Sequence, residues 1–99
     1  MLDLDKYLNQ GLDIKINGEV VSVKQPTAAM VKEIRKIENS TNGKNDLDNK
    51  SKITQLLLDN NTSGKKFTIE DVDKIPFKVQ DIIMGEIFKF IAEADNDPN

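Results

Sequence analysis

Residues 67–94 read FTIEDVDKIPFKVQDIIMGEIFKFIAEA, and we expect the rest of the chain to be organised around this stretch. When its second part is placed on a helical wheel at ~100° per residue, the apolar side chains cover roughly 240° of the circumference. A helix that is buried on one side needs an apolar arc of only ~100°. The pattern therefore predicts a helix with two covered faces, one packed on its own domain and one on something else.

The start of this stretch contains two local signals for helix boundaries. Thr68 can cap the backbone N–H of Asp71, and Phe67 and Val72 occupy the two positions of a hydrophobic staple. Pro76 disfavours helix at the preceding residue and suits the first turn of a new helix. We expect a short helix over Ile69–Lys74, a bend, and a long helix from Pro76 to about Ala94.

We divide the apolar arc of the long helix into two sets of side chains. The set assigned to the domain's own core is Ile75, Val79, Ile82, Ile83 and Phe90. The set assigned to a partner is Phe77, Met84, Ile87, Phe88 and Ile91, with Ile87 on the boundary. The alternative, which fits the pattern about equally well, is a core helix sandwiched between the helix expected from about Asp48 and the hairpin.

The segment from Leu12 to Lys24 alternates with period two around Asn17-Gly18, a pair that accepts the positive φ of a tight hairpin turn. A two-residue loop pairs Ile14 with Val21, and directly paired residues share one face of the hairpin. An isolated two-stranded hairpin is marginal in water. Its apolar face must therefore lie on helices or find more strands in a second subunit.

The remaining segments predict helices joined by a polar loop. A short helix is expected near Leu4–Leu8, another after Pro26, and a third from about Asp48, with Ser40–Asn49 as a mobile loop. The fold class is thus mainly α with a short N-terminal β-hairpin (α+β). We expect one domain of four to five helices over residues 1–94, with the hairpin at about 12–24 and a disordered acidic tail at 95–99.

Composition argues against several classes of function. The chain has 99 residues without cysteine or histidine, and it shows no glycine-rich phosphate loop or converging carboxylates, so we expect neither an enzyme nor a metal or cofactor site. The net charge is −3 with both signs interspersed, which disfavours nucleic acid as a partner. No apolar run reaches membrane-spanning length and no signal peptide is evident, which predicts a cytoplasmic protein that does not bind membranes.

Three pieces of the chain carry a likeness to a known family: the hairpin and its extension over residues 14–27, the helix Met30–Glu38, and residues 68–83 with their continuation to Phe90. In this order they resemble the tail assembly chaperones of long-tailed (siphovirus-type) bacteriophages. The resemblance implies a protein of the host cell cytoplasm that binds the phage tape-measure protein, assists tail-tube assembly and then leaves the particle. The tail-tube protein is a further partner that it suggests.

An apolar helix face that contains Met and Phe is also what would receive the apolar stripe of a long helical partner. The alternative function is a small structural or interaction protein of a phage particle, a head-tail or tail component that self-associates through the same face. Self-association is expected in either case, because a domain of this size buries a limited core.

Overall fold

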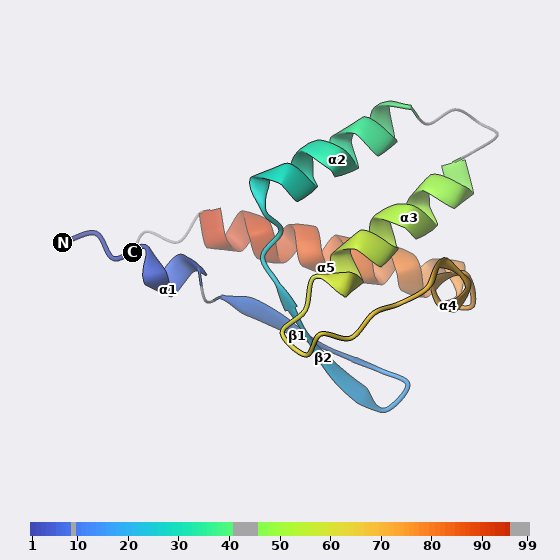
Figure 1. The fold of residues 1–99 in the computed structure, drawn as a ribbon, viewed down its shortest axis with the longest axis horizontal. Helices are drawn as coiled ribbons and strands as arrows, with labels where there is room; N and C mark the ends of the chain where they lie inside the picture. The colour runs from blue at the N-terminus through green and yellow to red at the C-terminus, as the bar shows by residue number, and fades with distance from the viewer. Residues whose placement is uncertain (9, 41–45, 96–99) are drawn as a thin grey trace.

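The computed structural model describes residues 1–8, 10–40 and 46–95, and side-chain surroundings as far as Phe90. Within these ranges the chain is mainly helical, with one antiparallel hairpin near the N-terminus, as the sequence predicts (Figure 1). The elements are α1 (Asp5–Leu8), β1 (Gly11–Ile16), β2 (Glu19–Lys24), α2 (Ala28–Asn39), α3 (Asp46–Asp59), α4 (Ile69–Asp73) and α5 (Phe77–Asp95).

The predicted register of the hairpin is confirmed. Ile14 lies opposite Val21, and both turn residues have positive φ, 53° at Asn17 and 81° at Gly18. Val21 and its neighbour on the same face, Val23, are 1% and 2% exposed. The apolar face of the hairpin therefore lies on the helices of the same chain.

An unpredicted third segment pairs with the outer edge of β2. Val23 and Asn61 form an isolated antiparallel bridge, in which the Lys24 N–H donates to the Asn60 carbonyl at 2.8 Å and the Thr62 N–H donates to the Ser22 carbonyl at 3.0 Å. The turn after α3 thus acts as a short third strand. This pairing leaves β1 as the open edge strand of the described sheet.

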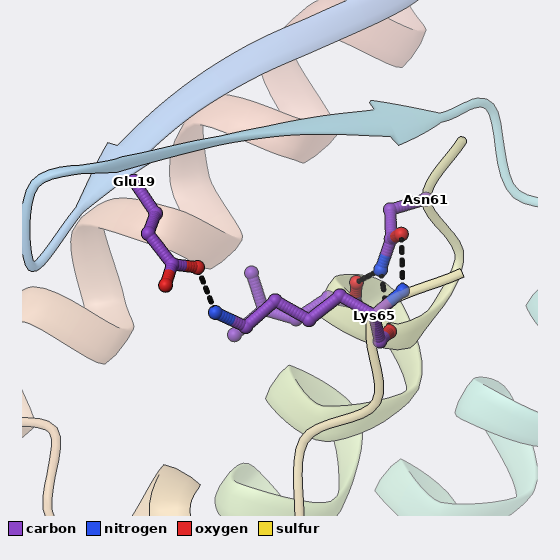
Figure 2. Close-up of polar contacts among 4 residues, drawn as sticks. Glu19, Asn61 and Lys65 are labelled. Carbon is purple, nitrogen blue, oxygen red and sulfur yellow. Dashed lines mark hydrogen bonds and ion pairs between the residues drawn. The ribbon is translucent and has the colours of Figure 1, made fainter. Parts of the chain in front are cut away.

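Asn61 organises the turn that carries this segment (Figure 2). Its side-chain amide donates to the carbonyls of Leu58 and Lys65, both at 2.8 Å, and its side-chain oxygen accepts from the N–H groups of Ser63 at 3.0 Å and Lys65 at 3.1 Å. Lys65 also forms an ion pair with Glu19 at the turn end of β2. One buried amide therefore fixes the exit from α3 and the strand that follows it.

The centre of the molecule is α3 rather than α5. It packs against α2, α4, α5 and β2, and it contributes more buried residues than any other described element. Its buried apolar side chains are Ile53, Leu57 and Leu58. The expectation that the chain is organised around the last helix is therefore wrong: α5 is one of several elements that cover α3.

The corner between α4 and α5 follows the predicted signals. The Thr68 hydroxyl accepts from the Asp71 N–H at 3.0 Å, and the Asp71 carboxylate accepts from the Thr68 N–H at 3.1 Å, which completes a capping box. The chain bends before Pro76, and α5 begins one residue after it. Gln80, 5% exposed, donates from its side-chain amide to the carbonyls of Val72 at 2.9 Å and Ile75 at 3.2 Å, so it ties the first turns of α5 to the end of α4.

The junction between α2 and α3 departs from the expected boundaries. The third helix begins at Asp46, inside the segment predicted as loop, and Asn49 is buried with its side-chain amide 3.4 Å from the Ile37 carbonyl at the end of α2. Residues 41–45, the middle of that predicted loop, and residues 96–99, most of the predicted acidic tail, lie outside the described part of the chain.

Candidate functional site

Part of the exposed apolar surface of α5 lies along one flank of the helix. Phe77, Met84 and Phe88 follow one another at spacings of seven and four residues, which places them within ~40° of one another around the axis. Phe77 is 57% exposed and Phe88 is 40% exposed, whereas Met84 is half-buried and packs against the core. These three residues form the α5 flank.

Each residue of the α5 flank borders a hollow on the surface. The hollow at Phe88 has a volume of about 310 Å³ and is lined by Pro26, Val31, Ile34, Arg35 and Glu38, mostly from α2. The hollow at Met84, of about 260 Å³, is lined by Glu38, Asp46, Asn49, Lys50 and Ile53. Glu38 lines both hollows, and we call the two together the α2–α5 groove.

The α2–α5 groove has an apolar floor and a charged rim. Ile34 and Ile53, from α2 and α3, are 3% and 4% exposed and belong to the core, while Arg35 and Glu38 are exposed. The main packing partner of α2 is α3, so α2 and α5 stand apart as the two walls of the groove. An apolar floor between two helical walls is the geometry that receives an amphipathic helix.

Phe77 lies in a different environment at the N-terminal end of α5. The Lys50 ammonium is 3.3 Å from the centroid of its ring and also forms an ion pair with Asp81, one turn further along α5. A cation over an aromatic face stabilises the contact between α3 and α5. One face of the Phe77 ring is therefore already occupied, and the groove proper is built around Met84 and Phe88.

Two of the predicted assignments on α5 are wrong. Ile87, placed at the edge of the partner surface, is 1% exposed and belongs to the core. Ile82, placed in the domain's own core, is 53% exposed. The buried face of the helix is thus rotated toward Ile87 and Gln80. The side-chain surroundings of Ile91, also placed at the partner surface, are outside the described residues.

The other assignments to the domain's core agree better with the structure. Ile83 is 5% exposed and lies in the core cluster, while Ile75 and Val79 are half-buried and pack against it. Phe90 is half-buried. The structure therefore brings Met84 and Phe88 of the predicted partner set together at the groove, with Phe77 apart from them and Ile87 beneath the surface.

Sequence reasoning missed the second wall of the groove. The stripe Met30, Val31, Ile34 and Ile37 predicts one buried face on α2, yet only Ile34 is fully buried and the other three are half-buried. The helical period identifies which side chains share a face but does not say how closely another element covers it. The signal in the sequence that could have indicated this wall is the set of four apolar residues on α2 itself.

Comparison of the chain with protein-family models, with curated proteins and with solved structures finds no match. The assignment of a function therefore rests on the residues and on the α2–α5 groove. No helix in the described ranges is long and apolar enough to cross a membrane.

Proposed function

We propose that this protein is a binding module whose α2–α5 groove receives an apolar helix of a partner protein. The observation that carries the proposal is the position of Phe88, an aromatic side chain 40% exposed at the edge of a hollow whose floor is the buried Ile34. Aromatic side chains, Phe among them, are enriched at the buried core of protein interfaces. The charged side chains of Arg35 and Glu38 at the rim suit the polar edge of such an interface.

We further propose that the partner is a phage tape-measure protein and that this chain is a tail assembly chaperone. The support is the resemblance of the hairpin, the following helix and the last helices to that family, together with a groove suited to a long helical protein. Covering the apolar stripe of a tape-measure protein until tail-tube subunits surround it would keep that protein soluble. The chaperone acts in the host cell cytoplasm and leaves the finished particle.

The second candidate is a structural component of the phage particle that uses the same groove for self-association. Its support is that the groove and Phe88 are open in the single chain. The two candidates differ in the fate of the protein, because a chaperone is absent from purified particles and a structural component is retained in them.

The test of the first candidate is co-expression with the tape-measure protein encoded by the same phage. Phe88→Glu places a charge where a partner helix would exclude water, so we expect complex formation to fall at least tenfold, which corresponds to about 1.4 kcal/mol or more. The free protein should keep its helical circular dichroism, because the side chain is already partly solvated. The readout is the amount of tape-measure protein in the soluble fraction and its co-purification with the chain.

Ile82→Glu is the matched control. Ile82 is also exposed and lies on α5, but it projects ~120° away from Phe88 and so away from the groove. This variant should bind the tape-measure protein as the parent does. Equal losses in the two variants, or no loss in either, would contradict a binding site in the groove. Presence of the chain in purified particles would favour the structural candidate.

A further inference from the structure

The open edge of the sheet is a second feature that points to a partner. The backbone groups of Ser22 and Lys24 bond to residues 60–62, so they face away from β1. In an antiparallel ladder, residue pairs alternate. The two residues of one pair point their backbone N–H and C=O groups toward each other, and those of the next pair point them outward. Asp13, opposite Ser22, and Lys15, two residues further along, therefore point their N–H and C=O groups outward along the free edge of β1.

The apolar face of β1 is less covered than that of β2. Leu12, Ile14 and Ile16 are half-buried and pack at the margin of the core, whereas Val23 and Val21, which lie opposite Leu12 and Ile14 on β2, are almost fully buried. A hollow of about 210 Å³ borders Ile16 and is also lined by residues 75, 76 and 79 of the α4–α5 corner. The edge strand thus offers backbone groups that no described residue pairs with, and apolar surface that another strand would cover.

We propose that β1 pairs antiparallel with β1 of a second copy of this chain, with Ile14 on the two-fold axis. The sequence of the strand, Leu12-Asp13-Ile14-Lys15-Ile16, is self-complementary when it is read against itself in this register. Asp13 of each copy lies opposite Lys15 of the other, Ile14 lies opposite Ile14, and Leu12 lies opposite Ile16.

Both hydrogen bonding and charge select this register. Asp13 and Lys15 are the residues with outward backbone groups, so pairing each with the other in the second copy aligns donors with acceptors. A shift by two residues in either direction keeps that alignment but places Asp13 opposite Asp13 or Lys15 opposite Lys15. Like charges that are directly opposite destabilise a strand pair, whereas opposite charges stabilise it.

The apolar side of the pair continues across the axis. Strands related by this axis keep their apolar side chains on one face of the sheet. The Ile14 side chains of the two copies therefore meet. Leu12 of the second copy lies opposite Ile16 and so beside the hollow at that residue. The six-residue strands then join two hairpins and their 60–62 segments into one sheet. The isolated edge strand of one chain becomes a central strand of the dimer, which removes the exposed edge.

The test is a charge exchange measured by sedimentation velocity at low ionic strength over a range of protein concentrations. Asp13 and Lys15 are exposed, so Lys15→Asp and Asp13→Lys should each keep the far-ultraviolet circular dichroism of the parent. Each single variant puts like charges opposite one another at two positions, and we expect the dimer dissociation constant to rise at least tenfold. The double variant Asp13→Lys with Lys15→Asp restores both opposite-charge pairs, and its dissociation constant should return to within about threefold of the parent value.

Restoration by the double variant would support the pairing, because at an unrelated interface the two charge reversals would have no reason to compensate for each other. A parent chain that stays monomeric at every concentration would overturn the proposal. So would a dimer that both single variants leave intact, or one that Phe88→Glu abolishes while the charge variants do not, because the interface would then lie elsewhere.

Discussion

The side chain of Asn61 offers the sharpest test of how the helices and the hairpin are held together. Asn61→Ala removes four hydrogen bonds from a residue that is 6% exposed. A buried hydrogen bond contributes about 1 kcal/mol net, which sets about 4 kcal/mol as the full loss. The backbone groups of Ser63 and Lys65 lie in a turn that can recover water, so we expect a loss of about 2–3 kcal/mol in the free energy of unfolding.

Urea unfolding followed by circular dichroism measures this loss. With a urea dependence of about 1.5 kcal/mol per molar, the midpoint should fall by about 1.3–2 M. Thr62→Ala is the control, because Thr62 is exposed and its backbone N–H, which donates to Ser22, is retained. Its effect should stay within about 0.5 kcal/mol. Equal midpoints for the two variants would show that the Asn61 amide does not hold the turn.

Two further measurements test the hairpin and the cap of α4. Val21→Ala should lower the free energy of unfolding by about 2 kcal/mol, because the side chain is 1% exposed. Val20 lies on the other face and is 60% exposed, so Val20→Ala should lower it by at most about 0.5 kcal/mol. Equal urea midpoints for the two variants would contradict the register. Hydrogen bonds from Thr68 lower the pKa of Asp71 below its ordinary value of 3.8. The capped carboxylate therefore stabilises the fold above that pH and loses its contribution as the pH falls through the folded pKa. Asp71→Asn should flatten the fall of the melting temperature below about pH 4, and parallel pH curves for parent and variant would refute the role of the cap.

The parts of the fold that could be predicted from the sequence depend on local chemistry. Asn17-Gly18 determines the turn, and with a two-residue loop the period of two leaves one register. Thr68 and Asp71 form a capping box within four residues, so no distant contact is needed to recognise it. These features are decided by neighbours in the chain, and the sequence contains them completely.

The parts that could not be predicted depend on contacts between distant segments. Residues 60–62 lack the alternating pattern of a strand, and their pairing with β2 follows from where α3 ends in space. On α5, the apolar pattern does not mark the polar Gln80 as core, yet its side-chain amide is buried and donates to the Val72 carbonyl near the end of α4. A core face that includes Gln80 is centred near Ile83 and Ile87, so Ile87 is buried, while Ile82, which projects ~140° away from Ile87, is exposed.

The two proposed surfaces, the α2–α5 groove and the edge of β1, involve different elements and could therefore be used at the same time. The groove is built from α2, α3 and α5, whereas the edge belongs to β1, so the proposed pairing of two β1 strands uses none of the residues that line the groove. A dimer of this kind would present two grooves held at a fixed separation by one continuous sheet. A long partner with a repeated apolar stripe could occupy both, and the second binding event would then be intramolecular. Affinity for a long helical protein could in that way exceed what a single open groove on a 99-residue chain provides.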